Sequence, residues 1–222
     1  MEIKRGLTMK MWFNKWKHLL GILSIPFQGL IYMGIASNVG PDIIFNYSWI
    51  DTQIPFVKWF IFPYISWMPV LYLSFIYLAF KNRSLYWRTL LIYNVSVMTC
   101  NVVFWFFPTY VPRPDVVSTD LASTLVNFIY QSDAPLNCFP SVHCLTSYLL
   151  FITLKRDLVV RRSVRFFMYT LLWLIIISTV FTKQHALIDV FGGILFAEVT
   201  YRIVQLTSSL SQQREKQVTT SL

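Results

Sequence analysis

The sequence predicts an all-α integral membrane protein, a six-transmembrane-helix bundle with both termini in the cytoplasm. Three observations support this fold class. Of the 222 residues, 55% are apolar and only 13% are charged, whereas a soluble domain carries roughly 25% charged residues. The apolar residues gather in six long runs, and the cations gather between runs on one side. This composition argues against a water-soluble fold.

Each apolar run is long enough to cross a bilayer. A hydrocarbon core of roughly 30 Å needs about 20 mostly apolar helical residues per crossing. The basic start of the chain leads into a long run rather than a short apolar segment with a cleavage site, so we expect the first run to remain as a span. The six runs cover residues 18–38, 56–80, 85–107, 136–154, 164–182 and 184–206.

The distribution of the cations predicts the orientation. All of the 19 Lys and Arg residues except Lys58, Arg113 and Lys183 lie in the N-terminal arm, in or beside the turns after the second and fourth runs, or near the C-terminal end. By the positive-inside rule that side is cytoplasmic and the other is extracytoplasmic. The formal net charge of +9 therefore reflects topology and contact with anionic lipid, and we expect no nucleic-acid partner.

The sequence predicts a single domain. We expect a six-helix transmembrane domain at residues 18–207, a basic cytoplasmic arm at 1–17 and a polar cytoplasmic tail at 208–222. Residues 39–55 and 108–135 are expected to form extracytoplasmic loops. The three cysteines show no metal-ligand spacing, so we interpret them as packing residues and expect neither a metal nor a cofactor. The expected location is the cell membrane, as a multi-pass protein.

Groups able to carry chemistry gather at one predicted membrane depth, on the extracytoplasmic face. Ionisable groups at the edge of a span cost several kcal/mol unless they are paired or hydrated, so such a grouping indicates a functional site. The candidates are Arg113 in the long loop, Ser141 and His143 at the start of the fourth run, and Lys183, His185 and Asp189 at the start of the sixth.

His185 and Asp189 are four residues apart on what we expect to be one helix. Side chains at that spacing share a helix face, so the carboxylate can bind one imidazole nitrogen and fix the tautomer of the ring. The other nitrogen is then available as a nucleophile or base. The alternative is a hydrogen-bonded pair that only joins helices.

Residues 137–143 are predicted to turn from loop into helix, with Pro140 at the first helical position. Unpaired amides at such a helix start favour an anion. Ser141 adds a hydroxyl and His143 a proton source. The alternative is an ordinary capped helix start that happens to contain a histidine.

Arg113 lies between two prolines, in a stiff turn where its guanidinium could hold two phosphate oxygens. Lys183 is either a second phosphate contact or an interfacial anchor. Each residue alone can be explained by a purely structural role. Three segments that bring cations, a hydroxyl and imidazoles to one face, however, indicate an anionic ligand. Two histidines, one backed by a carboxylate, suit phosphoryl transfer better than carboxylate binding.

These residues resemble the motifs of the type 2 phosphatidic acid phosphatase superfamily, which contains lipid phosphate phosphatases, lipid phosphotransferases and soluble vanadium haloperoxidases. The first motif ends in Arg-Pro, the second is Pro-Ser-Gly-His, and the third ends in His-x-x-x-Asp. The corresponding residues here are Arg113-Pro114, Pro140-Ser141-Val142-His143, and His185 with Asp189.

The sequence departs from the family pattern at three places. Phe106 stands where the first motif usually has Lys, Val142 where the second has Gly, and Thr179 where the third has Arg. Two phosphate-holding cations of the usual pattern are therefore missing, and Lys183 is the residue that we expect to compensate. The segment at residues 181–185 is similar to the branch that includes inositol phosphorylceramide synthases.

The resemblance implies a mechanism without a metal. His185, oriented by Asp189, attacks phosphorus and forms a phosphohistidine, while His143 protonates the leaving oxygen. Ser141, Arg113 and Lys183 hold the other phosphate oxygens. Water then releases phosphate, or an alcohol accepts the group.

The leading expectation is a lipid phosphatase that hydrolyses a phosphomonoester or diphosphate of a lipid. Phosphatidate, a phosphatidylglycerophosphate and a polyprenyl diphosphate are the expected kinds of lipid phosphate partner. A phosphotransferase of the same superfamily, similar to inositol phosphorylceramide synthase, is the first alternative. The second is a non-catalytic membrane protein that binds an anion with the same cluster.

Overall fold

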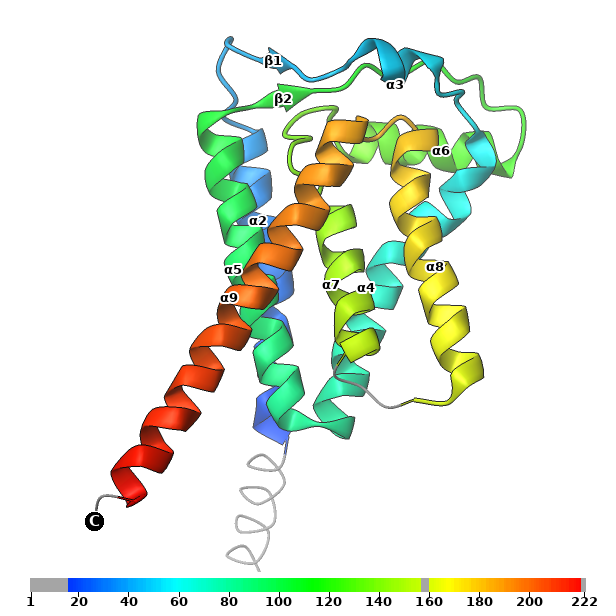
Figure 1. Ribbon diagram of the computed structural model, residues 1–222. Helices are drawn as coiled ribbons and strands as arrows, with labels where there is room; N and C mark the ends of the chain where they lie inside the picture. Colours follow the sequence, from blue (N-terminus) through cyan, green and yellow to red (C-terminus); the bar gives the residue numbers. More distant parts are fainter. Residues whose placement is uncertain (1–15, 157–159, 221–222) are drawn as a thin grey trace, which may run out of the picture.

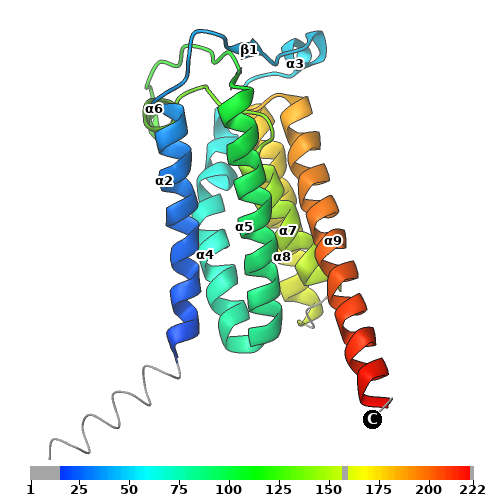
Figure 2. The same cartoon turned by 90° about the vertical axis from the view of Figure 1, so that its left-hand side faces the viewer.

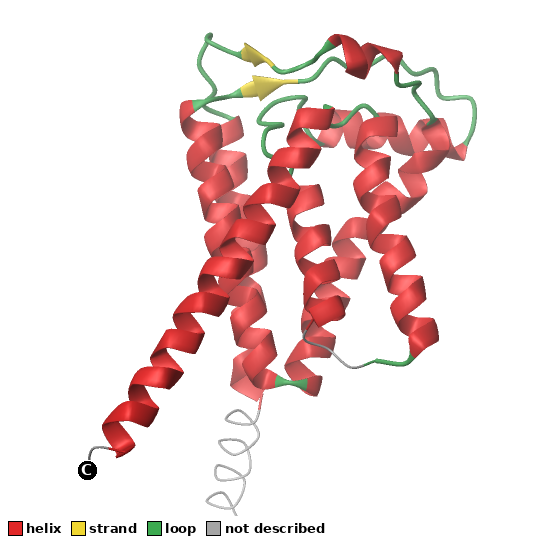
Figure 3. Ribbon diagram, in the orientation of Figure 1, coloured by secondary structure: helices red, strands yellow, loops and turns green. Residues whose placement is uncertain are grey.

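The computed structural model describes residues 16–156 and 160–220, with side chains described as far as residue 209. This part of the chain is a bundle of long helices, and loops with short elements cover one end of it (Figures 1 and 2). We call this the capped end. Apart from two short strands in the cap, the regular elements are helical (Figure 3). The all-α prediction is therefore confirmed for the bundle.

Within the described residues, four helices are long and apolar enough to cross a membrane. They correspond to the first, second, third and fifth predicted spans, so the membrane character of the chain is confirmed. The four are η1 (Lys17–Leu23) continued by α2 (Ser24–Ala36), η2 (Lys58–Phe60) continued by α4 (Ile61–Lys81), α5 (Arg83–Phe106), and α8 (Arg162–Phe181).

The fourth and sixth predicted spans correspond to helices of a different character. α7 (Val142–Arg156) has only 15 residues, and α9 (Leu187–Thr220) carries Asp189, Glu198 and Arg202 in its apolar part. α7 contacts α4, α5, α8 and α9. Because neighbouring helices surround α7, it can carry buried Thr and Ser residues that a lipid-facing helix would expose. That both helices cross the membrane stays a prediction.

Local sequence marks two features of the spans, a change of helix geometry within the first span and the turn between the second and the third. The first span changes from 3₁₀ to α geometry at Ser24, and Pro26, which has no amide hydrogen to donate, lies in the first turn of α2. Asn82 separates α4 from α5, and its side chain accepts a hydrogen bond from the Leu85 amide at 3.0 Å. This cap starts α5 immediately after the turn.

The cap corrects the prediction that residues 39–55 and 108–135 are loops. β1 (Ile44–Phe45) pairs in parallel with β2 (Thr109–Tyr110), and α3 (Trp49–Gln53) and α6 (Leu121–Ser132) are helices. α6 begins with a capping box formed by Asp120 and Ser123. It has 12 residues, too few for a span, so counting apolar runs cannot detect it.

Three predicted boundaries also change. The fourth predicted span starts at residue 136 but α7 starts at Val142, and the sixth starts at 184 but α9 starts at Leu187. The predicted tail at 208–222 continues as helix to Thr220, and no Gly or Pro interrupts this stretch. This end of α9 extends away from the bundle (Figure 1). Of the predicted basic arm, residues 1–15 lie outside the described residues.

The packing has the pattern of a membrane protein. The core contains large buried side chains such as Phe75, Tyr86 and Phe104. Leu73 of α4 and Phe166 of α8, in contrast, are 65% and 74% exposed on the outer surface of the bundle. A wide apolar outer surface would favour aggregation in water. In a bilayer it contacts acyl chains, and the helices are held together by close packing and polar contacts.

Candidate active site

The candidate site lies under the cap, where α7 and α9 begin (Figure 1). His185 Nε2 lies 3.4 Å from His143 Nδ1, although the two residues come from different elements. His143 is in the first turn of α7, and His185 is in the turn that precedes α9. The structure thus brings together two of the three residues that the sequence predicted to be catalytic.

The ring of His143 is fixed by aromatic neighbours from α4. Its centroid lies 4.8 Å from that of Tyr64 and 4.0 Å from that of Trp67. Trp67 is itself held, because its indole nitrogen donates to the Thr146 hydroxyl at 2.7 Å. An imidazole packed in this way keeps Nδ1 directed at His185.

Asp189 joins four parts of the site. Its Oδ2 lies 3.5 Å from His185 Nδ1 and accepts the Ala186 amide at 2.8 Å. Its Oδ1 accepts from Asn46 Nδ2 at 2.6 Å, and its backbone oxygen accepts the Ser141 amide at 3.0 Å. The carboxylate therefore caps α9 and faces the ring of His185 at the same time.

The expectation that His185 and Asp189 share one helix is wrong. α9 begins at Leu187, so His185 lies before the helix and Asp189 lies in its first turn. The cause is that the Asp189 side chain binds the Ala186 amide, which places the N-terminal cap of the helix after the histidine. The carboxylate still faces the ring, at the distance given above. His185 Nδ1 is buried and has no hydrogen-bond partner among the described residues.

Ser141 is the N-terminal cap of α7. Its Oγ accepts the Cys144 amide at 3.2 Å, and the residue is fully buried. Pro140, which follows a cis peptide bond, therefore precedes the helix instead of occupying its first position, a second correction. The first amides of the helix, at Val142 and His143, have no carbonyl partner within the helix and remain donors at this end.

Gly193 lets α9 come close to the start of α7. A Cβ atom added there would collide with the backbone oxygen of Ser141 and would lie 3.0 Å from the Leu145 nitrogen. The two helices that carry Asp189 and His143 thus meet at a point where only glycine fits.

Arg113 binds the segment that leads into α7. Its guanidinium donates to the backbone oxygen of Asp133 at 2.5 Å and to the side-chain oxygen of Gln184. It also lies 4.8 Å from the centre of the Tyr130 ring. Arg113 Nε is buried without a partner among the described residues. The residue is close to the turn of His185 through Gln184, as the prediction of a shared site requires.

Lys183 is also at this end, but its ammonium group is fully occupied. It donates to the backbone oxygens of Asp51 at 2.9 Å and Ile54 at 2.5 Å, and to the Tyr47 hydroxyl at 3.0 Å. The residue is only 7% exposed. These contacts tie the segment around α3 to the turn before α9, and they do not support the expected contact with phosphate.

Asp51 strengthens the same connection from the other side. Its Oδ1 accepts the Leu187 amide at 2.8 Å, and its Oδ2 accepts the Ser48 hydroxyl at 2.5 Å. Burial alone would raise the pKa of Asp51, but these hydrogen bonds and the nearby Lys183 charge hold that pKa below its usual value. The ionised carboxylate of Asp51, which lies in the loops at the capped end, therefore binds the N-terminus of α9.

Three further residues were not predicted from the sequence. Asn46 binds Asp189, as described above, while Asn137 and Gln184 line the same cavity as the two histidines. Gln184 Nε2 and both side-chain polar atoms of Asn137 are buried without partners among the described residues. The only local signal is that Gln184 adjoins His185. The contact of Asn46 joins residues 143 positions apart, which no sequence period reveals.

Cys138, His185 and Asp189 also come together, and one ligand atom from each lies within 4.8 Å of the others. The spacing of the cysteines gave no sign of this cluster. Both carboxylate oxygens of Asp189 already accept hydrogen bonds, from Asn46 and Ala186. A metal ion here would have to compete with these bonds, so the contacts favour orientation of the histidine over metal binding.

The two positions that lack the usual cations have different surroundings. Phe106 is 67% exposed at the end of α5. Thr179 is fully buried, and its backbone oxygen accepts the amides of Gln184 at 2.9 Å and His185 at 3.1 Å. Thr179 thus holds the turn that carries His185.

A cavity of about 420 Å³ extends from the histidines into the bundle. One part of its wall holds Arg113, Asn137, His143, Gln184 and His185, and the other part is formed largely by apolar side chains of α2, α4 and α5. Those side chains include Met33, Met68, Leu71, Val97 and Phe104. An elongated molecule with a polar end and an apolar end would match both parts of the wall.

Comparison with known families identifies one to which the chain is similar. The family model described as the PAP2 superfamily matches residues 33–203, more than half of the chain. No curated protein and no solved structure matches the chain.

Proposed function

The chain belongs to the PAP2 superfamily, the type 2 phosphatidic acid phosphatases and their relatives, and from this premise we propose that it is a membrane-embedded lipid phosphate phosphatase of the cell membrane. Family membership supports phosphatase-like or phosphotransferase-like chemistry. The finer proposal is carried by one observation: the His143–His185 pair lines the polar end of an apolar cavity, and Asp189 lies behind His185. Such a cavity suits a phosphate attached to an apolar chain.

The nucleophile that we propose is His185 Nε2. Asp189 Oδ2 faces Nδ1 of the same ring, and a proton on Nδ1 leaves the Nε2 lone pair free to attack. The separation of 3.5 Å is longer than a good hydrogen bond, and such contacts often tighten only when substrate binds. Asp189 would then stabilise the positive charge that develops on the ring.

His143 is the proposed general acid. In this role His143 starts as an imidazolium, with one proton on Nδ1, the nitrogen that lies 3.4 Å from His185 Nε2, and it becomes a neutral ring when it gives that proton up. When Nε2 bonds to phosphorus, the bond from phosphorus to the leaving oxygen breaks, and His143 gives that oxygen its proton. In-line displacement places nucleophile and leaving oxygen on opposite sides of phosphorus, so the 3.4 Å between the two nitrogens has to open as substrate enters.

In the second half of the reaction His143 acts as a base. It removes a proton from a water molecule whose oxygen attacks phosphorus, and the bond from phosphorus to His185 Nε2 breaks. Inorganic phosphate leaves, and both histidines return to their first state.

We assign the phosphate oxygens to donors around this pair. The donors are the Ser141 hydroxyl, the guanidinium of Arg113, the first amides of α7, and the unpaired side-chain nitrogens of Asn137 and Gln184. Ser141 Oγ accepts from Cys144, which leaves its own hydrogen to donate. Lys183 receives a different role from the expected one, because we propose that it positions the turn of His185 through the cap.

Transfer to an alcohol is the second candidate, and one observation favours it. Gln28 and Asn101 lie in the otherwise apolar wall of the cavity and bind one another at 3.0 Å. The buried side-chain oxygen of Asn101 has no donor among the described residues. An acceptor hydroxyl could use that oxygen, and the phosphohistidine would then be attacked by the alcohol instead of water.

The test is phosphate release by the purified protein in detergent with EDTA. The substrates are phosphatidate, a phosphatidylglycerophosphate and undecaprenyl diphosphate. We expect release that survives chelation and falls by at least about a thousandfold in His185→Ala. His18→Gln is the matched control, since it replaces the remaining histidine of the chain, at the far end of the bundle. It should keep full activity.

Label from a substrate with radioactive phosphorus should also remain on the protein in an acid-labile form and be absent from His185→Ala. No release from any lipid, together with label transfer to an added alcohol, would favour the transferase. No release and no transfer would reject both enzymes and leave an anion-binding protein.

A further inference from the structure

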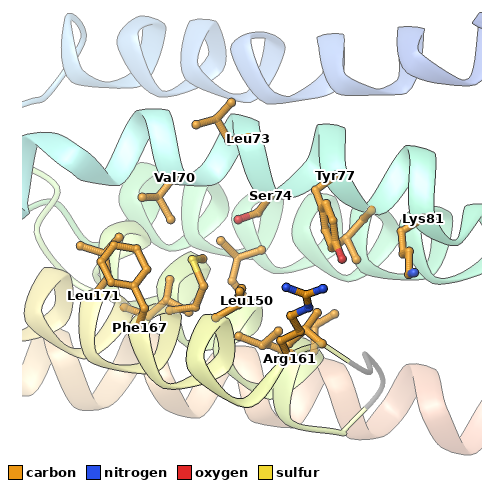
Figure 4. Close-up of a pocket in the computed structure, with 16 residues that line it drawn as sticks. Val70, Leu73, Ser74, Tyr77, Lys81, Leu150, Arg161, Phe167 and Leu171 are labelled. Carbon is orange, nitrogen blue, oxygen red and sulfur yellow. The ribbon is translucent and has the colours of Figure 1, made fainter.

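A second cavity lies at the opposite end of the bundle from the histidine pair. It has a volume of about 940 Å³ and is lined by α4, α7, α8 and the two residues before α8 (Figure 4). α4 runs from the capped end at Ile61 to Lys81, and Lys81 lines this cavity. Within the described residues the two cavities share no lining side chain. The second cavity is therefore a separate candidate site.

The wall of this cavity is largely apolar. Leucine, valine, methionine and phenylalanine side chains form most of it, and Ser74 and Thr153 are minor polar contributions. Figure 4 shows Val70, Leu150, Phe167 and Leu171 at one part of the cavity, on three different helices. An apolar space of this size between helices accepts an acyl chain and offers little to a polar solute.

The other part of the cavity is cationic. Lys81 at the end of α4 and Arg161 at the start of α8 line it, and both residues are exposed. Figure 4 shows the guanidinium of Arg161 and the hydroxyl of Tyr77 directed to the same region, with the amine of Lys81 nearby. Neither cation has an acidic partner among the residues that the structure describes.

The two parts together define one kind of occupant. A neutral lipid would satisfy the apolar wall but leave the two charges without a counter-ion. A small anion would satisfy the charges but leave the apolar space unfilled. Lys81 and Arg161 stand at the ends of predicted spans, at the depth of lipid head groups, where each cation near an anionic surface contributes on the order of 1 kcal/mol.

We propose that this cavity binds an anionic phospholipid of the bilayer. One acyl chain lies between α4, α7 and α8, and the phosphate is held by Lys81 and Arg161 with the Tyr77 hydroxyl. The ligand is bound and not consumed, because the cavity contains no histidine, cysteine or carboxylate side chain among its lining residues. The site is independent of the proposed phosphatase chemistry.

The experiment is native mass spectrometry of the purified, delipidated protein. It is offered equal amounts of a phosphatidylglycerol and a phosphatidylcholine with identical chains, in a non-ionic detergent. We expect the first bound lipid to be phosphatidylglycerol by roughly thirtyfold, on the basis of two cations at about 1 kcal/mol each. The double variant Lys81→Gln with Arg161→Gln should lose that preference and still bind lipid weakly.

The matched control is Lys155→Gln with Arg162→Gln. It removes the same charge at the same end of the bundle from residues that do not line the cavity, and it should keep the preference. A second variant, Ser74→Phe, should fill the apolar space and reduce binding of both lipids at an unchanged melting temperature. Both changes leave the histidine pair untouched, so phosphate release in detergent should not change.

Three results would overturn the proposal. Equal binding of the two lipids would show that acyl chains alone fill the space. An equal loss of preference in the control variant would show that net charge, and not this cavity, selects the lipid. Displacement of bound lipid by millimolar glycerol phosphate would show a site for the head group alone.

Discussion

The two ends of the bundle contain cations in opposite circumstances. At the capped end, Lys183 is buried and donates to three oxygens, and Arg113 is bonded to the segment before α7 and to Gln184. At the other end, Lys81 and Arg161 are exposed and have no acidic partner among the described residues. The contrast teaches that Lys183 serves the structure of the capped end and that Arg113 keeps only Nε without a partner in the described part of the chain, whereas Lys81 and Arg161 remain fully available to a ligand.

The cap is held by hydrogen bonds to the turns that carry the proposed catalytic groups. Asn46 binds Asp189, and Asp51 accepts the first amide of α9. The segment 39–57 thus contributes to the site although it contains neither a histidine nor one of the family motifs. Rigid positioning of this kind is what phosphoryl transfer asks of a protein.

The largest expected effect on stability comes from removing the ammonium group of Lys183 at the capped end. In Lys183→Met, the Ile54 oxygen and the Tyr47 hydroxyl lose the ammonium donor, and the buried Asp51 oxygen keeps only its bond from Tyr47. Bonds from a charged group are worth about 1.5–3 kcal/mol each before non-additivity. We expect the free energy of unfolding to fall by about 3 kcal/mol, which lowers the melting temperature by roughly 6–12 °C. Thermal unfolding in lipid-free detergent measures this.

Lys81→Met is the control at the opposite end. It removes an exposed charge, so stability should change by less than about 0.5 kcal/mol. Equal melting temperatures for the two variants would show that the buried bonds of Lys183 contribute no net stability, and the comparison between the two ends would fail.

The second prediction concerns the contact of α9 with α7. In Gly193→Ala, the new methyl group meets the backbone oxygen of Ser141, so one helix has to move. Overpacking of this kind costs about 1–3 kcal/mol, and the shift should also separate Asp189 from the start of α7. We expect a lower melting temperature together with reduced phosphate release.

Gly34→Ala is the matched control for this substitution. A Cβ atom at Gly34 meets no described atom within 4 Å, so stability and activity should remain unchanged. If Gly193→Ala also left both unchanged, the close approach of the two helices would not be needed for the site.

Much of this arrangement follows from the sequence, and the reasons for the rest are physical. Apolar runs and cation placement predict the helices and bring Arg113, His143 and His185 to one end, because those signals extend over many residues. The predicted start of α9 was wrong because one side chain, Asp189, sets the N-terminus of the helix. Asn46 and Lys183 act through tertiary contacts across more than 120 residues, and no local pattern encodes such a contact. The catalytic roles themselves stay predictions.

The smallest expected effect separates positioning from stability at the capped end. Asn46→Ala removes the hydrogen bond of 2.6 Å to Asp189 Oδ1, while Asp189 keeps its bond to the Ala186 amide. A bond to a charged acceptor is worth about 1.5 kcal/mol at the low end, so we expect kcat to fall roughly tenfold. KM should hardly change, because Asn46 does not line the cavity. Asn38→Ala changes an exposed residue immediately before the segment 39–57. It is the control and should leave kcat unaltered. A melting temperature as low as that of Lys183→Met would show that Asn46 only holds the cap in place, whereas a stable variant with reduced kcat would show that the cap tunes the carboxylate behind His185.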